Sequence, residues 1–177
     1  MNNIYIRAIY SPGFSYVTLS FFKTNLSVGF SPWVSKDQTG RNQYDTKKFV
    51  STTINDEDVA SLLWLSKQII DGTLSNPIQY LIECNKYTSL LFTHDSDKTC
   101  LIIEKNKEKV VFEFPTHQYR VKEDGKIVTK TILSGLLVFS EALQAYLTAV
   151  GADRQQDKQT GTGFGASQVQ GSSSVWT

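Results

Sequence analysis

The first 36 residues combine aromatic side chains with cations and contain no carboxylate. This stretch holds 8 of the chain's aromatic residues, which number 3 Trp, 8 Tyr and 10 Phe in all, and the first acidic residue of the chain is Asp37. Aromatic rings stack on nucleic-acid bases whatever the identity of the base, and cations follow the phosphates. The composition of this stretch therefore favours contact with single-stranded nucleic acid.

The alternation of strand residues divides these side chains between two faces. Tyr10, Phe21 and Phe30 share a parity with the aliphatic positions, and we assign them to the core. The opposite parity, which is predicted to bind nucleic acid, holds Tyr5, Arg7, Tyr16, Phe22 and Trp33. The alternative is that these side chains cover a second core face or a subunit interface.

Further cations fall where turns are expected, around Gly40 and between residues 98 and 130. The second stretch holds eight cations against five acids, so it can attract a polyanion although the net charge of the chain is only +1. The alternative is that these lysines guard solvated strand edges. The remaining predicted nucleic-acid contacts are Lys23, Lys36, Arg41, Lys47, Lys48, Lys98, Lys105, Lys107, Lys109, Tyr119, Arg120 and Lys122.

Residue types that build catalytic or metal sites are sparse. The two histidines, His94 and His117, have no second ligand at a spacing typical of metal sites. Cys84 and Cys100 are predicted to be buried free thiols. The chain also lacks a phosphate-binding loop and a nucleophile elbow. We therefore expect no metal, no cofactor and no enzymatic activity.

The elements that must position these side chains follow the same order in two halves. Strand-like alternation up to residue 54 is followed by Asn55, a favourable N-cap, and by an apolar helical stripe that ends at Gly72. Four strand-like runs between residues 78 and 114, and a hairpin turn at residues 123–125, precede a second helix that is expected to end at Gly151. The segments 49–54 and 127–132, which lead into the two helices, share an apolar pair, hydroxyl residues and an isoleucine.

This pattern predicts an α+β fold of two repeats, each with four antiparallel strands plus one helix, at about residues 1–73 and 77–151. Residues 1–151 are then a single nucleic-acid-binding domain. Residues 152–177 are predicted to be a disordered tail, because Gly, Ser, Gln and Thr dominate the composition after Gly151. Trp176 near its end is a candidate contact for a protein partner, and a solubilising tail without a partner is the alternative.

The element order, the internal repeat and the length, over about residues 3–150, resemble the Whirly fold of single-stranded-DNA-binding proteins. The resemblance implies two sheets packed against each other and protomers that assemble through their helices. The lysine-glycine-lysine signature of the plant members is absent, so none of their DNA contacts is carried over to this chain. Similar small single-strand-binding proteins occur in viruses, which would place such a protein in the host cell cytoplasm.

Composition narrows the class of protein further. The chain of 177 residues has a pI of about 7.7 and 20% charged residues, which indicates a folded domain, and no continuous apolar run reaches about 18 residues. The N-terminal residues do not resemble a secretory signal, so we expect an intracellular, cytoplasmic protein with no membrane contact. Leu133, Phe139 and Ala142 lie outside the main apolar stripe of the second helix, which favours a homo-oligomer.

These observations together predict a non-enzymatic single-stranded-DNA-binding protein with little sequence preference, which supports replication, recombination or transcription. One alternative is an oligomeric structural or interaction protein whose aromatic sheet face binds another protein. A second alternative is an RNA-binding protein, since base stacking alone does not separate DNA from RNA.

Overall fold

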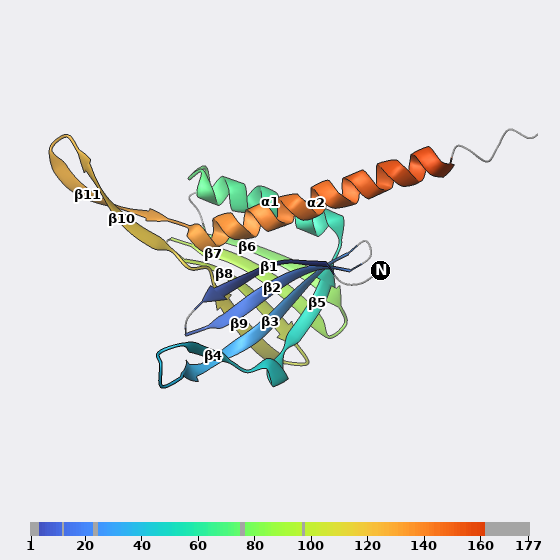
Figure 1. The fold of residues 1–177 in the computed structure, drawn as a ribbon, viewed down its shortest axis with the longest axis horizontal. Coiled ribbons are helices and arrows are strands. Elements are labelled where there is room, and N and C mark those ends of the chain that lie inside the picture. Colours follow the sequence, from blue (N-terminus) through green and yellow to red (C-terminus); the bar gives the residue numbers. More distant parts are fainter. Residues whose placement is uncertain (1–3, 12, 23–24, 75–76, 97, 162–177) are drawn as a thin grey trace, which may run out of the picture.

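The computed structural model describes residues 4–11, 13–22, 25–74, 77–96 and 98–161, apart from the side chains of residues 4–6, 22 and 153–161. Within these residues the chain forms three antiparallel sheets and two α-helices (Figure 1). The predicted α+β fold class is confirmed.

The first sheet is built from the N-terminal third of the chain. Its strand β3 is long, and pairs with β5 along its first half and with β4 along its second half. The sequence predicts a single strand near residues 44–52, but the structure has two strands in this part of the chain, separated by a turn. The carboxylate of Asp45 accepts hydrogen bonds from the backbone N–H groups of Lys47 and Lys48, which forms a short 3₁₀ turn between them. The strands are β1 (Ile4–Ser11), β2 (Ser15–Phe22), β3 (Asn25–Lys36), β4 (Asn42–Tyr44) and β5 (Val50–Ile54).

The second sheet is a simple meander in which each strand pairs with the next. The sequence predicts these strands at residues 78–84, 87–93, 99–105 and 110–114, and each lies within one or two residues of its predicted position. They are β6 (Ile78–Asn85), β7 (Thr88–Asp95), β8 (Lys98–Lys105) and β9 (Glu108–Glu113). The strands β10 (His117–Glu123) and β11 (Lys126–Ile132) form a separate two-stranded ribbon that projects away from the body (Figure 1).

The core lies between the inner faces of the first two sheets and the helices. Strands β2 and β3 lie against β9, and the hydroxyl of Ser15 donates a hydrogen bond to the backbone carbonyl of Val111 at 2.9 Å. Figure 1 shows the two sheets crossing, with both helices along one side. The side chains of Phe30, Phe92 and Phe112 are fully buried in this single core. Each sheet therefore has one buried face and one face turned away from the core.

The first helix, α1 (Asp56–Ile70), begins and ends as predicted. The side chain of Asn55 accepts a hydrogen bond from the N–H of Asp58 at 2.8 Å, and Gly72 adopts a φ of 68° just beyond the helix. A positive φ of this kind is favourable for glycine and strained for most other residues.

The second helix, α2 (Ser134–Gly161), passes straight through Gly151, so its predicted end was wrong. A glycine inside a helix is disfavoured by only about 1 kcal/mol relative to alanine, which its helix-forming neighbours offset. Residues 152–161 of the predicted tail are thus helical. The rest of that tail, including Trp176, lies outside the described residues.

The buried arc of α2 is wider than the sequence suggested. Phe139 and Ala142, which were predicted to lie outside the core stripe, are buried, whereas Leu137 is partly exposed. The reason is that α2 packs against both β1 and α1, and the phenol of Tyr146 donates to the carboxylate of Asp56 on α1 at 2.6 Å. By length and composition alone Ser134–Ala152 is long and apolar enough to cross a membrane, and 44% of this window is buried inside the fold.

Candidate nucleic-acid interface

A bulge in β1 decides which side chains reach the outer face of the first sheet. The register with β2 shifts between Tyr5 and Arg7, and beyond the shift Tyr10 lies opposite Tyr16. One extra residue in a strand makes each side chain after it point to the opposite face of the sheet from the one that simple alternation predicts. Ile9 is consequently 6% exposed, while Tyr10 is 57% exposed. The assignment of Tyr10 to the core was therefore wrong, and Tyr10 joins Tyr16 on the outer face.

Three tyrosines gather at one end of this outer face. The ring centroids of Tyr10 and Tyr16 are 5.4 Å apart, those of Tyr10 and Tyr44 5.7 Å, and those of Tyr16 and Tyr44 5.0 Å. Tyr16 and Tyr44 meet edge to face, a favourable arrangement for aromatic pairs. We call Tyr10, Tyr16 and Tyr44 the tyrosine cluster. Burial raises the pKa of Tyr44, and the neighbouring Tyr10 raises it further by a smaller electrostatic effect. The phenol of Tyr44 is therefore neutral at physiological pH.

Beside the tyrosine cluster, the outer face carries small hydroxyl residues. Two cross-strand rows contain them: Thr18–Gly29–Ser51 and Ser20–Ser27–Thr53. The ring of Phe49 lies on Gly29, and any side chain at position 29 would collide with that ring. We call the five hydroxyl residues the hydroxyl floor: Thr18, Ser20, Ser27, Ser51 and Thr53.

Strands β1, β2, β3 and β5 contain no carboxylate among their residues. Asp37 and Asp45 lie in the connections on either side of β4 and are occupied by local hydrogen bonds. Asp37 accepts from the hydroxyl of Thr39 at 2.7 Å and from the backbone N–H of Arg41 at 2.9 Å, and these bonds lower its pKa. The outer face of the first sheet thus presents rings and hydroxyl groups to a polyanion without opposing charge.

The hydroxyl floor continues into a groove where β5 meets the turns of the second sheet. This groove has a volume of about 400 Å³ and opens into a second hollow of about 810 Å³. We call the two together the turn groove. Its wall nearest the first sheet is formed by Ser27, Ser51, Thr53, Asn85, Tyr87 and Lys105.

Tyr87 lines both hollows of the turn groove and is 63% exposed. Its backbone is held on both sides: the Asn85 side chain accepts from its N–H at 2.9 Å, and its carbonyl accepts from the N–H of Asn106 at 3.0 Å. The ammonium of Lys86 lies 5.4 Å from the centroid of the Tyr87 ring. A fixed turn therefore presents an exposed aromatic ring next to a cation.

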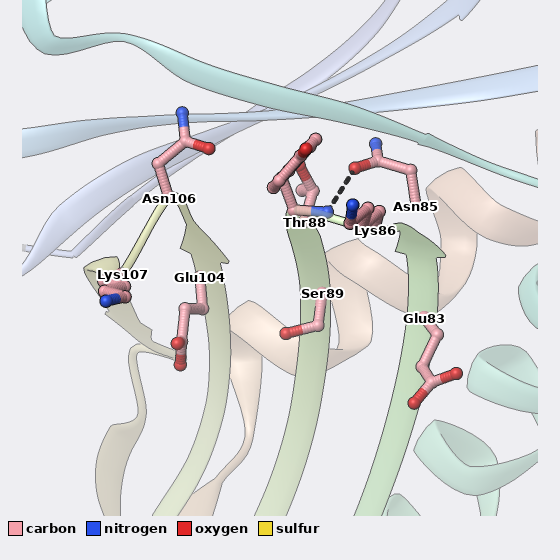
Figure 2. A pocket seen from close by; sticks show the side chains of 9 residues that line it. Glu83, Asn85, Lys86, Thr88, Ser89, Glu104, Asn106 and Lys107 are labelled. Atoms are coloured by element: carbon pink, nitrogen blue, oxygen red, sulfur yellow. Dashed lines mark hydrogen bonds between the residues drawn. The ribbon is translucent and has the colours of Figure 1, made fainter.

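The far end of the turn groove is acidic. Figure 2 shows Glu83, Ser89 and Glu104 on three neighbouring strands, with Asn85 and Asn106 at the strand ends nearer the first sheet. Carboxylates repel phosphates, so a nucleic acid that follows the groove is expected to stop before Glu83 and Glu104.

The structure brings only part of the predicted contact set to this surface. Tyr16 lies on the predicted face, and Trp33 lies half-buried beside Tyr44, where its indole N–H donates to Asn42 at 3.3 Å. Four of the predicted cations border the surface. Lys47 and Lys48 precede Phe49, and Lys105 and Lys107 line the turn groove.

Other predicted contacts lie elsewhere. The bulge places Arg7 opposite Leu19 on the helix side of β1, so its assignment to the outer face was wrong. Lys98 and Lys109 lie on the outer face of the second sheet, where Lys109 forms an ion pair with Glu104 at 3.3 Å. Lys36 and Arg41 flank the loop between β3 and β4, and Tyr119, Arg120 and Lys122 lie on the projecting ribbon. Outside the described residues fall Lys23 and the side chains of Tyr5 and Phe22.

The sequence did not point to Tyr44, Phe49 or Tyr87 as site residues. Tyr44 and Phe49 flank the 3₁₀ turn, where alternation gives no parity, and Tyr87 belongs to a turn. The adjacent pair Lys86-Tyr87 in that turn was the one local signal available.

The structure also positions the residues that might have built a chemical site. His94 is buried and its Nδ1 lies 2.9 Å from the hydroxyl of Thr99. Cys84 and Cys100 are free thiols but only partly buried, so the prediction of buried thiols was wrong, and the burial that they do have raises the pKa of both. Across the part of the chain that the structure describes, no group of three or more His, Cys, Asp or Glu side chains could hold a metal ion.

Comparison with known proteins gives little beyond this geometry. No protein-family model and no curated protein matches the chain. Among solved structures, the crystal structures of trypanosome MRP1/MRP2 are similar, at 9% sequence identity and a TM-score of 0.41 over 82% of each chain. A likeness this distant carries no argument about function, which must be argued from the surface itself.

Proposed function

We propose that this chain binds single-stranded nucleic acid, with DNA as the favoured ligand, across the outer face of its first sheet. The observation that carries the proposal is the tyrosine cluster beside a hydroxyl floor on strands without carboxylates. Single-stranded nucleic acid offers flat bases and a polyanionic backbone, and this surface has a group for each.

The tyrosine cluster supplies the stacking surface. Tyr10 is the most accessible of its three rings, and Tyr16 and Tyr44 hold it from the side. Every base has a π-face, so stacking discriminates weakly between sequences. Binding of this kind requires no reacting group, and we propose a protein with little sequence preference and no enzymatic activity.

The hydroxyl floor and the flanking lysines suit the backbone of the ligand. Hydroxyl groups donate hydrogen bonds to phosphate oxygens, and lysines neutralise phosphate charge and release condensed counterions. A strand that starts at Lys47 and Lys48 would cross the hydroxyl floor and reach Tyr87 and Lys105 in the turn groove. The two aromatic sites then lie at opposite ends of one path.

We also propose that the chain forms a homo-oligomer, and the surface between its two helices is suited to this contact. A hollow of about 860 Å³ lies between α1 and α2, and its apolar lining includes Ile70, Leu137, Ala145 and Ala149. An exposed apolar hollow between two helices is typical of an interaction site. Assembly through this helix side would leave the outer face of the first sheet open, as expected from the resemblance to Whirly proteins.

Fluorescence anisotropy with labelled 20-mers tests the proposal, using single-stranded DNA, single-stranded RNA and duplex DNA of mixed sequence. We expect single strands to bind more tightly than duplex and the affinity to fall with salt. The single-strand affinity should fall in Tyr16→Ala and stay unchanged in the matched control Val111→Ala on the second sheet. Equal affinity for duplex, or unchanged binding in Tyr16→Ala, would reject this surface as the site. Tighter binding of RNA would replace DNA as the ligand and leave the site in place.

A further inference from the structure

The outer face of the second sheet carries a continuous row of aliphatic side chains. Cross-strand pairing places Leu81 beside Leu91, Leu91 beside Ile102, and Ile102 beside Val111. Leu81 is 55% exposed and Val111 is 37% exposed, with the other two partly exposed between them. We call this row the aliphatic stripe. It crosses all four strands of the sheet, whereas single exposed aliphatic residues are ordinary on protein surfaces.

Two polar rows border the aliphatic stripe, and both contain carboxylates. One consists of Glu83, Ser89, Glu104 and Lys109, and the other of Gln79, Thr93, Cys100 and Glu113. Three carboxylates and one lysine around an apolar strip disfavour a polyanion. The chemistry of this face therefore favours a protein over a nucleic acid as its partner.

We propose that the aliphatic stripe is the contact between two copies of this chain, packed face to face about a two-fold axis parallel to the strands. Such an axis lays the stripe of one copy on the stripe of the other in reverse order, so aliphatic side chains meet aliphatic side chains. Two-fold interfaces are self-complementary by symmetry, and they are the commonest among homo-oligomers.

The charges of the polar rows agree with this symmetry. Reversal places Glu83 of one copy opposite Lys109 of the second copy, and Ser89 opposite Glu104. In the other row it places Gln79 opposite Glu113. No two carboxylates face each other in either row. Among the described residues of one copy, Lys109 forms an ion pair with Glu104 alone, at 3.3 Å and on an exposed surface, so it is available for a second carboxylate.

The geometry of sheet packing permits this arrangement. Two sheets that pack face to face lie about 10 Å apart and rotate by about 30° because each is twisted. Under that rotation the centre of the stripe, at Leu91 and Ile102, stays in register, and Glu83 and Lys109 on the edge strands are offset by a distance that their long side chains can span. The outer face of the first sheet lies across the core from this interface. The pair would therefore carry two nucleic-acid surfaces pointing away from each other.

Sedimentation velocity over a range of protein concentrations tests the proposal without nucleic acid. The double variant Leu81→Lys/Val111→Lys places charge on the exposed ends of the stripe, and we expect its pair dissociation constant to rise by about tenfold or more. The matched control is Ile127→Lys on the projecting ribbon, an aliphatic residue that is 73% exposed and lies outside the stripe, which should leave this association unchanged. Circular dichroism melting checks that each variant is folded.

A charge exchange identifies the symmetry. Glu83→Lys and Lys109→Glu should each weaken the association, and the double exchange should restore it, because the two charges meet across the interface. Both side chains are exposed, so this series keeps the test open even if the stripe variants fail to fold. The proposal is overturned if the wild-type chain does not form this pair, if the stripe variants associate like wild type, or if the double exchange is as weak as the single changes.

Discussion

The first and second sheets of this protein have inner faces of similar chemical character and outer faces of different chemical character. Inside, both contribute large apolar side chains to one core, with Phe30 from the first sheet and Phe92 from the second. Outside, the first sheet bears tyrosines and hydroxyl groups, whereas the second bears aliphatic and carboxylate side chains. A fold built from two similar units constrains only the buried half of each strand. The outer half is free to serve a different ligand in each sheet.

The largest expected effect tests the likeness of the inner faces. Phe30→Ala and Phe92→Ala each remove a fully buried ring, and each should lower the free energy of unfolding by about 3–5 kcal/mol. Urea denaturation of both variants measures this. A loss below about 1 kcal/mol in one of them would show that the two sheets do not share a core of equal tightness.

The next effect tests the contrast of the outer faces. Tyr16→Ala should weaken single-strand binding by about 1–3 kcal/mol, the usual contribution of one base–aromatic stack. Thermal melting accompanies the anisotropy titration, because Tyr16 also contacts Tyr10 and Tyr44. Tyr87→Ala should weaken binding less if the strand ends at the turn groove. If a variant of the aliphatic stripe, such as Leu81→Ala, lost as much single-strand affinity as Tyr16→Ala, the outer faces of the two sheets would not differ in nucleic-acid binding.

Salt dependence separates the cations of the two sheets. Lys47→Ala/Lys48→Ala should reduce the slope of log affinity against log salt by about 0.7 for each phosphate contact that is lost. Lys109→Ala should leave the slope unchanged, because Lys109 lies on the second sheet and pairs with Glu104. Titrations at four salt concentrations give both slopes. A larger change for Lys109→Ala would move the ligand to the other sheet.

The smallest effect uses the two thiols as reporters. Burial raises the pKa of Cys84 and Cys100, so both hold less thiolate at neutral pH than a free cysteine does, and they should alkylate more slowly. The rate should rise as the pH increases toward the raised pKa. Cys100 lies on the outer face of the second sheet, so single-stranded DNA should not protect it. Protection of Cys100, read by mass spectrometry, would contradict the proposed site.

Much of the fold could be predicted because its signals are local. Alternation marked β6 to β9 to within one or two residues, and Asn55 with Gly72 marked both ends of α1. The end of α2 could not be predicted, because a glycine after an apolar helical stripe, such as Gly151, is the usual signal for the end of a helix. Its helix continues nonetheless, since a single glycine is too weak to end a helix that its neighbours support.

The candidate site was less predictable because a single residue of register controls it. The bulge before Arg7 sends Tyr10 outward and Arg7 toward the helices, and no feature of the sequence marks that bulge. Tyr44 joins the tyrosine cluster only through the pairing of β4 with the far half of β3. Contacts of this kind depend on which strands pair and in which register, and the alternation of residues along a single strand gives no information about either.

The packing of α1 against α2 also sets the order in which the chain can fold as it is synthesised. Lys67 on α1 donates to Gln144 on α2 at 3.1 Å, across 77 residues of sequence, and the bond from Tyr146 to Asp56 spans 90. The first sheet and α1 leave the ribosome long before α2 exists. The second sheet can cover part of their apolar surface first, but the part that contacts α2 stays uncovered until this last helix is synthesised, so the outer face of the first sheet forms before the fold that supports it is complete.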